Sequence, residues 1–204
     1  MKKTILLSVI VLFTSITVFA KKQNYIPIEI FLKTGEVKNG YAERLNSGYD
    51  DYVSFKKNEG AEVEKIESFK IKKMAYKIDG KIYEYWFLNC YKGWGQKKIG
   101  NPKWLNLIKE GYVNLYKFNT QMNVGFGSIS SSNFTDYYCL REQEGEKAAK
   151  WISAVAGANN NQMFRAKAPL YFADYPELAK KIKDKEYKWN DLYEVIDIYN
   201  KWKQ

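Results

Sequence analysis

The hydrophobic periodicity of the chain changes once, near residue 142, and this change limits the folds that it can adopt. Residues 26–32 place an apolar side chain at every second position, which is the pattern of a half-buried strand. Residues 192–199 instead repeat apolar side chains at helical spacing and form one stripe. The sequence therefore predicts an α+β fold. We expect an antiparallel β-hairpin sheet or small barrel, about residues 25–142, followed by C-terminal helices, about residues 144–202, packed on it.

Glycine turns divide the β-rich part into hairpins. The clearest turn is Asp79-Gly80, because this pair suits the positive φ angles of a two-residue hairpin loop. The alternation slips by one residue in the preceding arm, which predicts a β-bulge near Lys72 and Lys73. We expect strands at 25–32, 36–44, 53–56, 69–78, 81–90, 105–109, 112–118 and 137–141. Two stretches, 91–103 and 120–136, are expected to be irregular.

Four helices are predicted after residue 142. They begin with 146–156 and 162–172, and Pro169 is expected to kink or split the second. Asp174 followed by Pro176 and Glu177 resembles a helix start with a carboxylate cap. Asn190 is expected to cap the last helix.

Residues 1–20 have the pattern of a secretory signal peptide. Two lysines precede an apolar run from Ile5 to Phe19, and small residues lead to Ala20. The run is shorter than a membrane-spanning helix usually requires, although an uncleaved anchor is the alternative. We expect cleavage near Ala20 and export to the periplasm or the exterior. The mature chain would have no transmembrane segment, and would comprise a β-rich region (21–142) and a helical region (143–204) in one compact domain.

The basic charge of the chain does not point to nucleic acid. The net charge of +10 falls to 10 − 2 = +8 when Lys2 and Lys3 leave with the leader. Only three of the 33 basic residues are arginine, namely Arg44, Arg141 and Arg165. Recognition of phosphates and guanine relies on the planar arginine fork, so we expect no nucleic-acid partner.

The chain has no histidine, which excludes Ser-His-Asp and Cys-His catalysis and the usual zinc sites with imidazole ligands. We expect neither a metal nor a cofactor. Cys90 and Cys139 are the two cysteines of a chain that is expected to enter an oxidising compartment. They form either one disulfide or two buried free thiols, because the sequence gives no distance between them.

The C-terminal region carries a resemblance. The run Tyr171-Phe-Ala-Asp-Tyr-Pro-Glu-Leu, followed by Ile182, Tyr187, Asp191-Leu192 and Ile198-Tyr199-Asn200, resembles the ending of uncharacterised exported proteins of Bacteroidota-type bacteria. Those proteins join a β-rich front to a helical tail. The resemblance covers about a third of the mature chain and implies an architecture and a compartment, but no site residues.

Aromatic residues make up 17% of the chain and are the one compositional feature that favours a binding function. Tyr91, Trp94 and Trp104 border the irregular stretch 91–103 and are the predicted ligand-binding residues, with 123–133 as a second contact segment. We expect a noncatalytic domain that binds an envelope polymer or protein partner. One alternative is a hydrolase with paired carboxylates from Asp50-Asp51, Glu62/Glu64/Glu67 or Glu142/Glu144/Glu146. The other is a structural subunit of an envelope complex.

Overall fold

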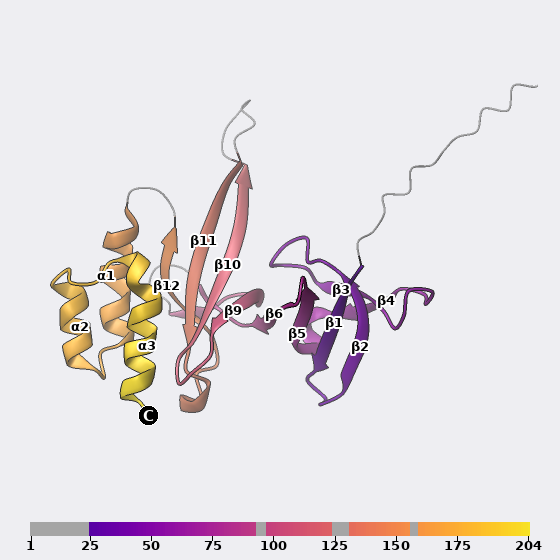
Figure 1. Cartoon of the computed structure of the whole chain (residues 1–204). Helices are drawn as coiled ribbons and strands as arrows, with labels where there is room; N and C mark the ends of the chain where they lie inside the picture. The colour runs from indigo at the N-terminus through magenta and orange to yellow at the C-terminus, as the bar shows by residue number, and fades with distance from the viewer. Residues whose placement is uncertain (1–24, 93–96, 124–130, 156–158) are drawn as a thin grey trace, which may run out of the picture.

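A computed structural model describes residues 25–92, 97–123, 131–155 and 159–204. In this part of the chain a ten-stranded sheet precedes three α-helices, which confirms the predicted α+β class (Figure 1). The sheet is open, so the alternative of a small barrel is wrong. The predicted leader, residues 1–20, lies outside the described residues. None of the helices described here has the length and apolar character that crossing a membrane would need.

The strands are β1 (Tyr25–Leu32), β2 (Val37–Glu43), β3 (Tyr52–Lys56), β4 (Glu64–Glu67), β5 (Ile71–Ile78), β6 (Lys81–Leu88), β7 (Tyr91–Lys92), β8 (Lys98–Ile99), β9 (Lys103–Lys109), β10 (Asn114–Asn123), β11 (Ser131–Leu140) and β12 (Lys150–Val155). The main sheet has the order β12-β11-β10-β9-β6-β5-β1-β2-β3-β4, and β7 pairs with β8 in a separate ribbon. Figure 1 shows β6 and β9 between two ends of this sheet, one formed by β1 to β5 and the other by β10 to β12.

The predicted hairpins form where the turn residues allow them. Asp79 and Gly80 have φ angles of 49° and 72°, as the tight turn between β5 and β6 requires. The pairing of β1 with β5 passes from Lys73 directly to Ile71, so Lys72 is the extra residue of a bulge. This confirms the bulge that the slip in alternation predicted.

Two predictions around residue 142 are wrong. Residues 150–155 form β12, paired with β11, in place of the predicted helix 146–156. Ile152 packs with the helices while Trp151 packs on the other face of the sheet, which is a period of two and not 3.6. Much of the predicted irregular stretch 120–136 belongs to the long β10–β11 hairpin. The sheet therefore extends past residue 142.

The helices are α1 (Asn160–Tyr171), α2 (Pro176–Lys183) and α3 (Leu192–Trp202). Pro169 does not split α1, because it lies two residues before the helix ends. Neither predicted cap forms. Tyr175 precedes α2, and the Asp174 carboxylate faces Arg141 and Tyr199 instead. A 3-10 turn, Trp189–Asp191, leads into α3, so Asn190 lies within this turn and does not cap the helix.

The hydrophobic core has three parts, divided by the sheet. The largest lies between the helices and one face of β10 to β12, where Leu115 and Phe164 are both fully buried. A second part covers the other face of these strands and includes Tyr116 and Leu140. The third lies in the N-terminal end of the sheet, around Ile30 and Met74. Each end of the sheet thus has its own core, and the helical tail stabilises only one of them.

Asn200 joins the end of α3 to the sheet. Its side-chain Oδ1 accepts a hydrogen bond from the Val113 amide at 2.7 Å, and its Nδ2 donates to the Val113 carbonyl at 3.1 Å. Gly111 lies beneath it, and a Cβ at Gly111 would come within 2.2 Å of the Asn200 amide nitrogen. The side chain therefore pairs with a buried backbone segment that no neighbouring strand satisfies at this residue.

Replacing Asn200 with alanine is expected to lower the free energy of unfolding by about 2 kcal/mol, because both polar groups of the buried Val113 backbone lose their partner. Urea unfolding measures the change. Asn58→Ala, at an exposed position in the β3–β4 loop, is the matched control and should unfold like the unmodified chain. Equal stability of the two variants would contradict the role given to Asn200.

Candidate functional site

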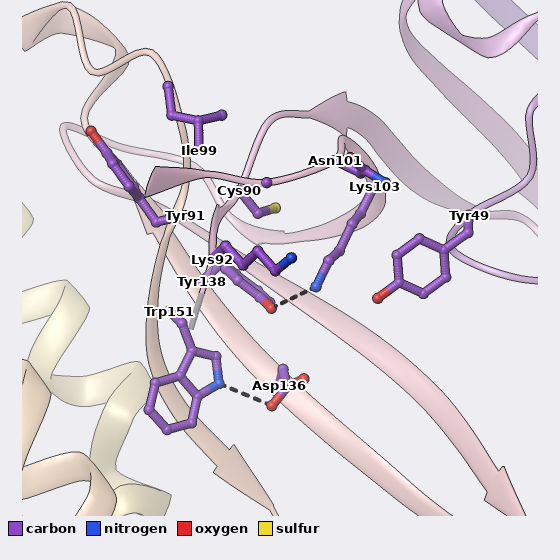
Figure 2. A pocket seen from close by; sticks show the side chains of 11 residues that line it. Tyr49, Cys90, Tyr91, Lys92, Ile99, Asn101, Lys103, Asp136, Tyr138 and Trp151 are labelled. Atoms are coloured by element: carbon purple, nitrogen blue, oxygen red, sulfur yellow. Dashed lines mark hydrogen bonds between the residues drawn. The ribbon is translucent and has the colours of Figure 1, made fainter. Parts of the chain in front are cut away.

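A cavity of about 520 Å³ lies where five segments of the chain meet (Figure 2). We call it the Lys103 pocket. The loop between β2 and β3, the β7–β8 ribbon, the start of β9, and strands β11 and β12 each supply side chains to it. Its aromatic side chains are Tyr49, Tyr91, Tyr138 and Trp151, and its charged side chains are Lys92, Lys103 and Asp136. Its volume falls in the range typical of small-molecule sites.

Lys103 is a half-buried cation surrounded by aromatic rings. Its Nζ donates a hydrogen bond to the Tyr138 hydroxyl at 3.0 Å. The same atom lies 4.7 Å from the ring centroid of Phe118, 5.2 Å from that of Tyr138 and 5.5 Å from that of Tyr49. At these distances the faces of the rings attract the ammonium group. No carboxylate of the described residues lies within ion-pair distance of it.

The ionisation of this lysine follows from its surroundings. Burial by itself lowers the pKa of Lys103, but the hydrogen bond to Tyr138 and the nearby Tyr138, Tyr49 and Cys90 outweigh it, so the pKa is raised. Burial also raises the pKa of Tyr138 to about 12, against the opposing effect of Lys103. At neutral pH the pair is therefore an ammonium group beside a neutral phenol.

Asp136 is the single carboxylate among the described residues that line the pocket. It accepts a hydrogen bond from Trp151 Nε1 at 2.9 Å, as Figure 2 shows. Burial raises the pKa of Asp136, although the Trp151 hydrogen bond and the charge of Lys103 oppose the rise. One oxygen of this carboxylate has a protein donor, and the other is suited to accept from a ligand.

The two cysteines do not form the disulfide that was one of the two alternatives. Both are free and buried. Cys139 points to the helix side of β11, whereas Cys90 lies in the core part on the opposite face of the sheet. The strand itself therefore separates their sulfur atoms. Burial raises the pKa of Cys90 to about 12, so this pocket residue is a neutral thiol and a poor nucleophile at neutral pH.

The three predicted binding residues have different positions. Tyr91 is half-buried and lines the Lys103 pocket. Trp94 lies outside the described residues. Trp104 is only 2% exposed and packs against Phe87 in the N-terminal core, so it is a core residue and not a surface contact. Of the second contact segment, 124–130 lie outside the described residues, while 123 and 131–133 belong to the β10–β11 hairpin.

Five of the eight carboxylates that were candidates for hydrolysis have structural partners, namely Asp50, Glu64, Glu67, Glu144 and Glu146. Asp50 accepts from the Asn46 amide at 2.6 Å and from the Ser47 amide at 3.2 Å, and so it orders its own loop. Glu64 pairs with Lys38, and Glu146 pairs with Lys150. None of the residues outside the described part is Asp or Glu. A second carboxylate is therefore missing from the Lys103 pocket, as far as the described residues line it.

Sequence reasoning missed most of this pocket. Lys103, Asp136, Tyr138 and Trp151 come from three strands, and their proximity depends on the order of β9, β11 and β12 in the sheet. The available signal was the charge at Lys103 next to an aromatic residue, but many lysines of this chain have aromatic neighbours in the sequence.

The described residues contain no cluster of three acidic or cysteine side chains that could hold a metal ion. No protein-family model, curated protein or solved structure matches the chain.

Proposed function

We propose that this protein is a noncatalytic, exported binding domain that holds part of an envelope polymer or protein partner in the Lys103 pocket. The observation that carries the proposal is the combination in one cavity of four aromatic side chains with a cation that has no carboxylate partner in the described residues. Aromatic rings and an unpaired charge give affinity and orientation to a ligand without any reacting group.

The pocket offers little for the alternative of a hydrolase with two carboxylates. Such an enzyme needs an acid and a second carboxylate about 5–10 Å apart across the scissile bond. Among the described residues that line the pocket, Asp136 is the only carboxylate. The Cys90 thiol and the Tyr138 phenol are both protonated at neutral pH. Binding is therefore the better-supported function for this site.

Replacing Tyr91 with alanine should weaken retention of the purified protein on envelope material about three- to tenfold, because the ligand loses one aromatic wall. Co-sedimentation with insoluble envelope fractions measures the retention. Tyr83→Ala is the matched control, since Tyr83 is an exposed tyrosine of β6 that does not line the pocket.

Equal retention of the Tyr91 and Tyr83 variants would contradict binding through the pocket. If in that case a protein partner co-purifies in fixed ratio, the structural-subunit alternative would be favoured. Release of soluble fragments from the polymer, dependent on Asp136, would favour the hydrolase.

A further inference from the structure

We propose that the Lys103 pocket binds a carboxylate-bearing sugar residue, such as one uronic acid unit of an acidic polysaccharide. This inference rests on the proposed binding function and adds the chemical class of the ligand. The carboxylate would lie at the Lys103 ammonium, the hydroxyls at Asp136, and the sugar ring against the aromatic walls. Four properties of the pocket support this arrangement.

The first property is the charge of the pocket. Lys92 and Lys103 both line it and Figure 2 shows both side chains extending into it, whereas Asp136 is the one carboxylate that the described residues supply. An ammonium group has three donors, and Lys103 uses one of them on the Tyr138 hydroxyl. A half-buried cation with unused donors favours an anionic ligand, because its remaining hydrogen bonds would then be made to a charged acceptor.

The second property is that the pocket suits an anion with a single charge at one end. The Asp136 carboxylate, which accepts a hydrogen bond from the neutral Trp151 indole, would repel a multiply charged phosphate. No arginine lines the pocket in the part of the chain that the structure describes, although the planar arginine fork is the usual partner of phosphate. A lysine acts as a point charge, which suffices for one carboxylate.

The third property is the hydrogen-bond acceptor of the site, the Asp136 carboxylate. A carboxylate that keeps an unfilled acceptor position needs a donor from the ligand, and sugar hydroxyls are such donors. The fourth is the aromatic lining by Tyr91, Tyr138 and Trp151, whose flat rings pack against the CH face of a sugar. An acidic peptide would satisfy the charge, but it lacks a rigid ring with hydroxyls around it. The saccharide therefore fits more of the site.

Titration calorimetry with three defined probes tests the ligand class on the purified protein. The probes are an oligogalacturonate, the same oligosaccharide with its carboxylates methyl-esterified, and an oligoglutamate of equal charge. We expect the oligogalacturonate to bind, and its affinity to fall about tenfold or more on esterification, as for a hydrogen bond to a charged group. Binding should also weaken as salt rises. The oligoglutamate is expected to bind more weakly than the oligogalacturonate.

Two variants locate the binding. Lys103→Met keeps the apolar stem and is expected to lose most of the affinity for the oligogalacturonate, while Lys57→Met, an exposed lysine outside the pocket, is the charge-matched control. Lys92→Met, at an exposed position, is expected to lose part of the affinity. If circular dichroism shows that Lys103→Met is unfolded, Lys92→Met replaces it as the test variant.

The outcomes separate this inference from the proposed function. Equal binding of the acidic and esterified probes, or tighter binding of oligoglutamate, would overturn the saccharide class. Absence of binding by all three probes would also overturn it. If in these cases the Tyr91 variant still loses retention on envelope material, the binding function stands with another ligand. If retention does not depend on Tyr91 either, both proposals fail.

Discussion

Replacing Trp104 with alanine is expected to lower the free energy of unfolding by about 3–5 kcal/mol, the usual cost of removing a large aromatic side chain from a core. Trp104 is 2% exposed, and its ring centroid lies 5.0 Å from that of Phe87. Its Nε1 also donates to Ser68 Oγ at 3.1 Å, and Ser68 is itself buried. The variant would therefore leave a cavity and remove the indole hydrogen bond to Ser68. Denaturant unfolding measures the loss.

Trp104→Phe tests the share of the hydrogen bond in this loss, and Trp202→Ala is the control for burial. Trp104→Phe keeps most of the ring but not the indole donor, so it should cost about 1 kcal/mol. Trp202→Ala removes a tryptophan that is 44% exposed, and it should cost clearly less than Trp104→Ala. If Trp104→Ala unfolds at the same denaturant concentration as the unmodified chain, the indole does not stabilise the core.

Trp104 also affects the pocket indirectly. Its backbone amide donates to the Gly48 carbonyl at 2.8 Å, and its indole nitrogen lies 3.3 Å from the Asp50 carbonyl. These two contacts hold the loop that carries Tyr49, whose ring lies in the pocket next to Lys103. Trp104 is therefore a positioning residue for a site to which its own side chain does not contribute.

Sequence patterns predicted correctly those elements whose structure depends mainly on neighbouring residues. The turn at Asp79-Gly80 requires positive φ, which these two residue types tolerate, and a hairpin forms there. The stripe of α3 needs an apolar surface, and its Val195, Ile196 and Tyr199 are fully buried on the sheet. In these cases neighbouring residues contain enough information.

The errors arose where distant residues decide the structure. The segment 150–155 is short, and its apolar residues fit a helix or a strand equally until its pairing with β11 is known. Asp174 looked like a helix cap, but Arg141 and Tyr199 compete for its carboxylate. Trp104 was assigned to a surface because it follows an irregular stretch, whereas β1 to β5 supply the core that covers it. Sequence reasoning singled out Tyr91, which lines the pocket, but it could not give the strand order that brings Lys103 near Asp136.

Arg141 is the centre of the polar network that attaches the helical tail to the sheet. It follows β11 and is 9% exposed. Its Nη2 donates to the Tyr171 carbonyl at 2.5 Å and to Asp174 Oδ1 at 3.1 Å, and its Nη1 lies 3.3 Å from Glu144 Oε2. The guanidinium carbon also lies 4.4 Å from the ring centroid of Tyr171. One planar group thus satisfies the end of α1 and two carboxylates, which a lysine could not do.

Replacing Arg141 with methionine is therefore expected to lower the free energy of unfolding by about 3 kcal/mol, because the Tyr171 carbonyl loses the guanidinium donor and two carboxylates lose one of their two cationic partners, the other being Lys203. Arg141→Lys should recover only a small part of this loss. Arg44→Met, at an exposed arginine, is the matched control and should be nearly neutral. Thermal and urea unfolding at pH 7 measure all three variants.

The dependence of the free energy of unfolding on pH below neutrality gives an independent test of the same network. Burial raises the pKa of Asp174, but hydrogen bonds from Tyr199 and Lys203 and the charge of Arg141 outweigh it, so the pKa is lowered. The hydrogen bond from Tyr112 and the charges of Lys203 and Arg141 lower the pKa of Glu144 as well.

A carboxylate with a lowered pKa stabilises the fold above its ordinary pKa of about 4, and this stability is lost as the pH falls through the lowered value. The unmodified chain should therefore lose stability below about pH 4, and Arg141→Met should lose less over that range because part of the interaction is already gone. Parallel stability curves for the two proteins from pH 7 to pH 2 would show that Arg141 does not stabilise these carboxylates.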